Sequence, residues 1–145
     1  IEAFGGPTQD GPTLFAWEGD RSLPNPGGMV RRRRDDEAIF PHTFEPVGRH
    51  VLELQGTVVA TGGWFTHYNP PYADLYMEVH PEHRRRGYAS YLLQELAREC
   101  LAKGLAPAAR CNPENLPSAG CLVKAGLRVC GKIVSAPVQA KMSTP

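Results

Sequence analysis

The pattern of hydrophobic and polar residues changes its period along the chain, and each period predicts a type of element. Residues 51–54 and 57–61 are rich in β-branched and aliphatic side chains and flank Gln55-Gly56, which predicts a hairpin. Residues 73–80 form a third β-rich run, which ends at Pro81, a residue that cannot continue a central strand. We therefore expect three successive strands in the middle of the chain.

After Gly87 the period becomes helical. Apolar side chains recur at spacings of three and four residues, with polar side chains on the opposite face. The apolar positions are Ala89, Leu92, Leu93, Leu96 and Cys100. Because Lys103-Gly104 is typical of a helix end, we expect a helix of about four turns.

The end of the chain predicts shorter elements. Residues 105–110 are apolar and suit a buried strand, and residues 127–134 suit a closing strand or hairpin. Between them, Asn115 is a typical N-cap, Pro117 suits a first helical turn, and Gly126 suits a helix end. The whole order predicts a mixed α/β (α+β) fold with one core.

The first third of the chain differs from the rest. Many of the 15 glycines and 14 prolines lie there, and apart from a short predicted strand at residues 13–17 it shows little periodicity. We therefore separate a Pro/Gly-rich N-terminal segment, residues 1–49, from a domain at residues 50–145. Since residue 1 is not Met, we expect this segment to be the remainder of a longer protein.

Composition and charge exclude several classes of function. The chain is 41% hydrophobic and 21% charged, as in globular proteins, and its formal net charge is +1. A near-neutral protein exerts little long-range attraction on nucleic acid or on anionic membranes. The block Arg31–Arg34 meets an acidic block at residues 35–37, which favours a solvated segment over a phosphate or nucleic-acid contact. No apolar run reaches about 20 residues, so we expect a cytoplasmic protein without membrane contact.

The four cysteines predict no metal site. They lie about ten residues apart, at positions 100, 111, 121 and 130, without the close pairs that structural zinc needs. We expect reduced, mostly buried thiols.

The residues most informative about chemistry are 79–89, where a strand end passes through a basic turn into a helix. The first N–H groups of a helix lack internal partners and bind anions. Gly87 permits a close backbone approach, and Arg84, Arg85 and Arg86 add positive charge. Neither a P-loop nor a dinucleotide-binding motif is present in the sequence. The alternative reading of the turn is a merely solvated basic segment.

Two motifs resemble those of the GNAT superfamily of N-acetyltransferases. Val79-x-Pro81 followed by Arg84-x-x-Gly87-x-Ala89 is similar to the coenzyme A signature of that family. Asn112-x-x-Asn115-x-x-Ser118, and then residues 124–127 (Lys-Ala-Gly-Leu), are similar to its later block. The two blocks have the family's order, and the resemblance covers roughly residues 50–134.

The resemblance implies a fold and a cofactor site. It implies a mixed, mostly antiparallel sheet that is splayed at the cofactor site and flanked by helices. Residues 50–145 would then be an acyl-CoA-binding acetyltransferase domain, with acetyl-CoA as co-substrate. The implied cofactor-binding residues are Met77, Val79, Arg84, Arg85, Arg86, Gly87, Tyr88, Ala89, Asn115 and Ser118. The resemblance also allows a homodimer.

The chain departs from the family pattern in two places. Residues 1–49 lack the helical periodicity of the family's early helices, which normally form part of the acceptor pocket. Leu122 occupies the position where many members carry a tyrosine that protonates the leaving thiolate. The acceptor side and the general acid therefore have to come from other residues.

Acyl transfer to an amine needs an unprotonated amine, because an amine with a pKa of about 10 is mostly protonated at neutral pH. Glu78 is the first candidate for the base, since it lies on the strand beside the expected thioester. Strand alternation places Tyr76 on the same face as Glu78. Tyr68, after the preceding strand, is a candidate acid, and His67 could reach the same cleft. An exposed carboxylate without a catalytic role is the alternative for Glu78.

Three functions follow from these observations. The first is an N-acetyltransferase that moves an acetyl group from acetyl-CoA to a primary amine of a small molecule or peptide by direct attack. The second is a catalytically degenerate acyl-CoA-binding or sensing module, which Leu122 favours. The third, nucleic-acid binding, is disfavoured by the charge balance.

Overall fold

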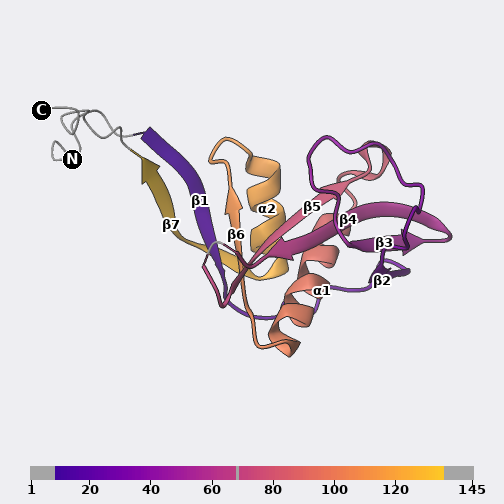
Figure 1. Ribbon diagram of the computed structural model, residues 1–145, viewed down its shortest axis with the longest axis horizontal. Helices are drawn as coiled ribbons and strands as arrows, with labels where there is room; N and C mark the ends of the chain where they lie inside the picture. The colour runs from indigo at the N-terminus through magenta and orange to yellow at the C-terminus, as the bar shows by residue number, and fades with distance from the viewer. Residues whose placement is uncertain (1–8, 68, 136–145) are drawn as a thin grey trace, which may run out of the picture.

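The computed structural model describes residues 9–67 and 69–135 as one seven-stranded sheet with two α-helices (Figure 1). The strands are β1 (Gln9–Trp17), β2 (Gly28–Arg32), β3 (His50–Leu54), β4 (Thr57–Phe65), β5 (Tyr72–Val79), β6 (Ala106–Cys111) and β7 (Leu127–Ser135). The helices are α1 (Tyr88–Ala102) and α2 (Leu116–Ala125), and a short 3₁₀ helix spans Pro81–His83. The predicted elements are all present, and the sheet is mixed and mostly antiparallel, as expected.

The sheet has the order β2-β3-β4-β5-β6-β1-β7. Only β5 and β6 pair in parallel; every other neighbouring pair is antiparallel. The predicted hairpin joins β3 to β4, and Gln55 and Gly56 both adopt positive φ, at 50° and 82°. Positive φ at both central residues matches the right-handed twist of the two strands.

The core lies between the sheet and the apolar face of α1. Leu92, Leu93 and Leu96 are at most 1% exposed, as the predicted periodicity requires. A Cβ on Gly62 would lie 2.8 Å from Leu96 Cδ1 and 3.3 Å from Leu92 Cδ2, so this glycine lets the helix approach β4 closely. The second helix packs against α1 and β7.

The first third of the chain contributes two strands to this sheet. β1 lies between β6 and β7, and its Phe15 is 2% exposed. β2 pairs with β3 along its whole length, from Gly28 opposite Leu54 to Arg32 opposite His50. No periodicity in the sequence predicted β2. In place of early helices, the connection between β2 and β3, residues 33–49, is a loop without a helix or a strand.

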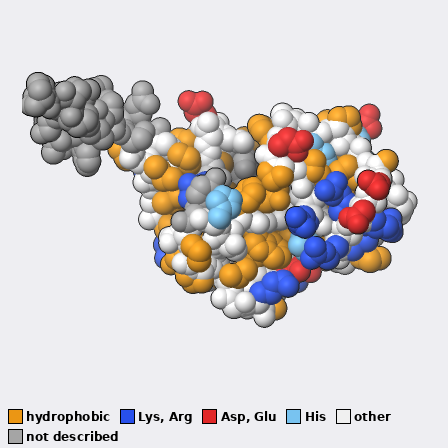
Figure 2. Space-filling view, in the orientation of Figure 1, with side chains coloured by type: hydrophobic (Ala, Val, Ile, Leu, Met, Phe, Trp, Pro, Cys, Tyr) orange, Lys and Arg blue, Asp and Glu red, His pale blue; other side chains and the backbone are white. Residues whose placement is uncertain are grey.

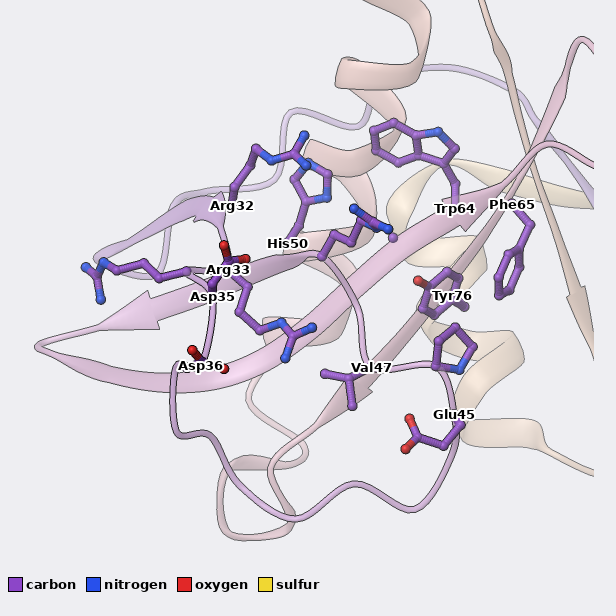
Figure 3. Close-up of a pocket in the computed structure, with 14 residues that line it drawn as sticks. Arg32, Arg33, Asp35, Asp36, Glu45, Val47, His50, Trp64, Phe65 and Tyr76 are labelled. Carbon is purple, nitrogen blue, oxygen red and sulfur yellow. The ribbon is translucent and has the colours of Figure 1, made fainter.

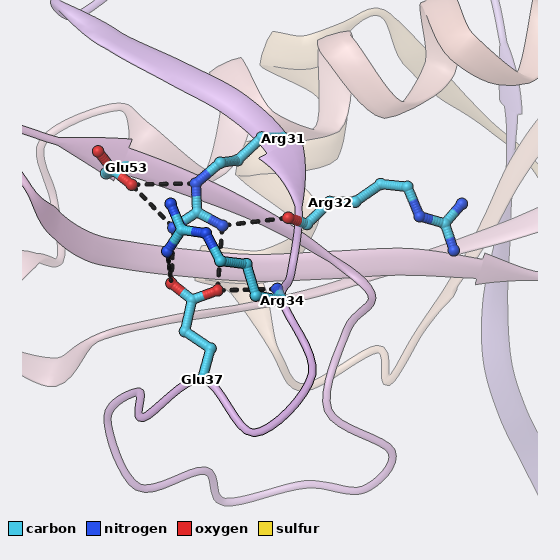
Figure 4. Close-up of polar contacts among 5 residues, drawn as sticks. All are labelled: Arg31, Arg32, Arg34, Glu37 and Glu53. Carbon is cyan, nitrogen blue, oxygen red and sulfur yellow. Dashed lines mark hydrogen bonds and ion pairs between the residues drawn. The ribbon is translucent and has the colours of Figure 1, made fainter.

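The interpretation of Arg31–Arg34 as a solvated segment is wrong for Arg31. Its guanidinium donates to Glu53 on β3, at 2.8 and 3.0 Å, and to Glu37 in the loop, at 2.6 and 3.0 Å (Figure 4). The side chains of Arg31 and Glu37 are only 16% and 10% exposed. This bidentate pairing fastens the start of the 33–49 loop to the sheet.

Candidate functional site

The strand β5 separates from its neighbour β6 halfway along its length. The two strands pair from Tyr72 opposite Ala106 to Leu75 opposite Ala109, and no further. Beyond that point β6 pairs only with β1, whose Thr13 lies opposite Cys111. On its other side β5 stays paired with β4 as far as Val79. The second half of β5 therefore has one edge without a neighbouring strand, which is the expected splay.

A tight turn follows β5 and aims the chain into α1. His80 Nδ1 accepts a hydrogen bond from the backbone N–H of Glu82, 3.0 Å away, at the start of the 3₁₀ helix. Arg85 and Gly87 then adopt positive φ, at 65° and 82°. The left-handed conformation at Gly87 explains the glycine of the first motif, because other residues pay a steric cost there.

The N-terminus of α1 is open. Gly87 is its N-cap and supplies no side-chain hydrogen bond, and the first helical bond runs from Tyr91 N–H to Gly87 O, at 3.1 Å. The preceding N–H groups, of Tyr88, Ala89 and Ser90, thus have no partner inside the helix and lie at the positive end of its dipole.

Basic side chains surround this turn. Arg84, Arg85 and Arg86 are exposed, and none makes a hydrogen bond or ion pair with another residue that the structure describes. Lys124, from the last turn of α2, places its Nζ 3.5 Å from the position that a Cβ on Gly87 would take. We did not predict Lys124, although it stands in the quoted block at residues 124–127. Open amides and these four cations fit a pyrophosphate.

The predicted residues Asn115 and Ser118 meet at the start of α2. The Asn115 side-chain oxygen accepts a hydrogen bond from Ser118 N–H, 3.1 Å away, which makes Asn115 the N-cap as expected. Their predicted contact with the cofactor stays a prediction.

The two faces of β5 have different surroundings. Met77 lies opposite Gly62, whose face is covered by α1, so Met77 and Val79 point toward the helix. Tyr76 and Glu78 point to the opposite face, toward the 33–49 loop. The open edge of β5 thus separates a helix-covered face from a loop-covered face.

The Glu78 carboxylate holds the loop. It accepts hydrogen bonds from the backbone N–H groups of Thr43, at 2.7 Å, and Phe44, at 3.2 Å. Partial burial raises the pKa of the Glu78 carboxyl, but these bonds, a further one from the Thr43 side chain and the nearby His42 outweigh it. The net pKa lies below the usual value, so Glu78 is ionised at neutral pH.

A cavity of about 1180 Å³ opens between the loop and the sheet (Figure 3). Figure 3 shows Tyr76 and Phe65 side by side on its wall, with Glu45 and Val47 of the loop across from them. A second, smaller cavity of about 180 Å³ is lined by Met77 and Glu78 and shares Tyr76 and Phe65 with the larger one. The larger cavity is lined by Arg32, Arg33, Arg34, Asp35, Asp36, Glu45, Pro46, Val47, Arg49, His50, Gly63, Trp64, Phe65 and Tyr76.

Comparison with known proteins decides the family. The model of the Acetyltransferase (GNAT) family matches residues 13–127 of this chain. The chain belongs to the GNAT family. The matched range includes residues 13–17 of β1, all of β2 and the 33–49 loop, which lie upstream of the region that our motif comparison covered.

The GNAT relatives share part of the chain. Acetyltransferases of Yersinia pestis (strain Pestoides F) and Yersinia pseudotuberculosis are 38% identical to it over 56 residues, or 37% of this chain and 38% of theirs. The match therefore spans well under half of the length of these relatives.

Solved GNAT structures have a similar fold. An acetyltransferase from Colwellia psychrerythraea superposes with a TM-score of 0.67 at 16% identity, over 88% of this chain and 56% of its own. A GNAT-family protein from Novosphingobium aromaticivorans gives a TM-score of 0.64 at 18% identity, over 88% of this chain and 65% of its own.

The other residues singled out from the sequence lie in the core, at the end of β4 or outside the described residues. Leu122, at the position of the family tyrosine, is 4% exposed and part of the core. Tyr68 lies outside the described residues. The His67 ring packs edge-on against Phe65, with ring centroids 5.4 Å apart. Of the four cysteines, which we expected to be mostly buried, Cys100 and Cys111 are buried, Cys121 is half-buried and Cys130 is exposed.

Tyr76, which we predicted to share a face with Glu78, lines both cavities. Its ring stacks on Phe65, with centroids 4.6 Å apart, and a Cβ on Gly63 would lie 2.8 Å from its Oη. Gly63 therefore leaves the space that the hydroxyl occupies. Burial raises the pKa of Tyr76, and the charges of Arg49 and Arg33 oppose the rise. The net effect keeps the phenol protonated at neutral pH.

Two general properties complete the description. No helix in the described ranges 9–67 and 69–135 has the length and apolar character of a membrane span. Within the same ranges, no group of three or more His, Cys, Asp or Glu side chains is arranged to hold a metal ion.

Proposed function

We propose that this chain is an N-acetyltransferase that transfers an acetyl group from acetyl-CoA to a primary amine of a small molecule or peptide by direct attack. The observation that carries the proposal is the open N-terminus of α1, adjacent to the unpaired edge of β5. The family supplies acetyl transfer as the reaction class.

The pyrophosphate would lie on the N–H groups of residues 87–90. Arg84, Arg85 and Arg86 would add charge from one side, and Lys124 from the other. From there the pantetheine arm would follow the open edge of β5 past Val79 and Met77. A β5 backbone N–H without a partner on that edge could donate to the thioester carbonyl as negative charge develops on it.

The acceptor amine would approach from the loop-covered face. Glu78 and Tyr76 lie on that face of β5; Tyr76 lines both cavities, and Glu78 lines the smaller one. Glu78 would take the amine proton, and Tyr76, which stays protonated at neutral pH, would give a proton to the leaving thiolate. The base role of Glu78 is the one predicted from the sequence, whereas Tyr76 takes the acid role that the sequence suggested for Tyr68.

Binding of acetyl-CoA tests the proposal through two matched glycines. Gly87 and Gly104 stand near opposite ends of α1, with φ of 82° and 77°, and no backbone atom crowds either one. Alanine at either position should cost about 1 kcal/mol of stability, because a residue with a Cβ would have to adopt the left-handed conformation. By calorimetry, we expect Gly87→Ala to weaken acetyl-CoA binding at least tenfold and Gly104→Ala to leave it unchanged. Equal effects would contradict the placement of the pyrophosphate.

The alternative is an acyl-CoA-binding module without turnover, and the observation in its favour is the buried Leu122. A thiol-release assay with acetyl-CoA and a panel of amines separates the two functions. Binding that depends on Gly87, with no thiol released for any amine, would favour the module.

A further inference from the structure

The larger cavity carries information about the acceptor that the family does not supply. Three carboxylates line it, from Asp35, Asp36 and Glu45, and all three belong to exposed residues at its rim. Among its half-buried and buried lining residues, the formally charged side chain is that of Arg33. The least exposed charged group of the cavity is therefore a cation, whereas the exposed lining residues carry both signs.

A second arginine, the exposed Arg49, stands next to Arg33. The Arg33 N–H donates to the Arg49 carbonyl, 2.7 Å away, so the two residues lie side by side where β2 ends and β3 begins. Neither guanidinium makes an ion pair with a carboxylate in the part of the chain that the structure describes. Neighbouring like charges repel each other unless an anion lies between them. In the space-filling view, blue side chains gather over the half of this face that holds β2, β3 and the loop (Figure 2).

His50 also borders this cavity and is 6% exposed, but its ring belongs to the other face of the sheet. It lies opposite Gly62, whose face is covered by α1, and its Nε2 is 3.0 Å from Glu99 Oε2 on that helix. Arg33 and Arg49 are therefore the residues that could hold an anion near Tyr76.

We propose that this cavity binds an anionic group of the acceptor, a carboxylate or a phosphate, through Arg33 and Arg49, and that the acceptor's amine points toward Tyr76. The inference rests on the proposed function and specifies its substrate class as amines that carry an acid. The stacked rings of Phe65 and Tyr76 offer an apolar wall for the part of the acceptor between the two groups. The charges of Arg33 and Arg49 also reach the Tyr76 phenol, which places them near the amine's expected position.

The experiment compares acids with their uncharged partners. Thiol release is measured at saturating acetyl-CoA for the common L-amino acids, for their amides, and for the matching aminophosphonates. We expect kcat/KM for at least one acid to exceed that of its amide about tenfold or more, as loss of a charge-assisted hydrogen bond predicts. A preference for the aminophosphonate over the amino acid would assign the group as phosphate.

Variants test the two arginines. Arg33→Gln and Arg49→Gln should each raise KM for the acid by roughly tenfold to a hundredfold, with KM for acetyl-CoA unchanged. Arg128→Gln, an exposed arginine on β7 outside the cavity, is the matched control and should change neither constant. Equal kcat/KM for acid and amide, or a KM for the acid that is unchanged in both arginine variants, would overturn the inference.

A direct binding measurement separates this inference from the proposed function. Calorimetry with the amino acids and aminophosphonates alone reports on the cavity, and calorimetry with acetyl-CoA reports on the α1 turn. Acetyl-CoA binding without any acid that binds or reacts overturns the inference and leaves the function standing. If an acid binds but acetyl-CoA does not, the proposed function is overturned and the assignment of the cavity as an anion site stands.

Discussion

At the scale of single residues, the Glu78 carboxylate has two roles: it holds the loop by hydrogen bonds, and it is the proposed base. It is ionised, which a base requires, but its oxygens accept hydrogen bonds from the Thr43 and Phe44 amides, and its pKa is lowered. A carboxylate with a lowered pKa is a weaker base, although it remains ionised over a wider range of pH. The structural and the catalytic contribution of Glu78 can therefore be separated by measuring stability and turnover together.

Glu78→Gln should lower kcat roughly a hundredfold, the usual contribution of a general base, while acetyl-CoA binding is unchanged. It should also lower the unfolding midpoint, since an amide is a weaker acceptor than a carboxylate for the two loop N–H groups. Asp74→Asn, on the same face of β5, is the control for kcat. An unchanged kcat with a lowered midpoint would mean that Glu78 only holds the loop.

At the scale of elements, the 33–49 loop takes the place of helices and is held by charge. Arg31 on β2 holds Glu37, and Glu78 on β5 holds the 43–44 amides, so each half of the loop is attached to the sheet at one point. Hydrogen bonding to Arg31 is the largest of the causes that lower the pKa of Glu37, from 4.5 to about 2. An element fastened by two carboxylates depends on pH more than an element fastened by apolar packing.

The loop should therefore loosen in acid. A carboxylate whose pKa is lowered on folding contributes stability above its unfolded pKa and loses it as the pH falls through its folded pKa. For Glu37 this loss should extend from about pH 4.5 to about pH 2. In urea titrations across this range, we expect Glu37→Gln to be less stable at pH 7 and to lose less stability in acid. Glu114→Gln, on an exposed turn, should follow the parent protein; parallel curves for all three proteins would refute the assignment.

At the scale of the whole molecule, the sheet joins both ends of the described chain. β1 pairs with β6 on one side and with β7 on the other, so β7 is part of the sheet through its pairing with β1. The boundary that we predicted at residue 50 lies between strands of one sheet. Whether residues 1–49 also continue into a longer protein stays a prediction.

Phe15 tests whether β1 is integral to the fold. Phe15→Ala removes a ring that is 2% exposed and should cost about 3–5 kcal/mol. Met29→Ala on the edge strand β2, where the side chain is 57% exposed, should cost less than about 0.5 kcal/mol. Urea midpoints measure both changes. A small loss for Phe15→Ala would mean that β1 docks weakly on an otherwise independent domain.

Prediction from the sequence succeeded where the signal is local. The period of α1, the Gln55-Gly56 turn and the Asn115 cap each depend on neighbouring residues, whose chemistry is visible in the sequence. Arg31 shows the opposite case: its partners Glu37 and Glu53 lie 6 and 22 residues away, and only strand pairing brings them together.

By itself the sequence determined the elements from residue 50 onward and the turn at the start of α1, because hydrophobic period, capping and backbone conformation act over a few residues. Only the tertiary structure decided where β1 and β2 join the sheet, which face of β5 carries Glu78, and that Arg33, Arg49 and His50 share a cavity with Tyr76. Those outcomes depend on register and packing between distant segments, which a pattern along the chain does not encode.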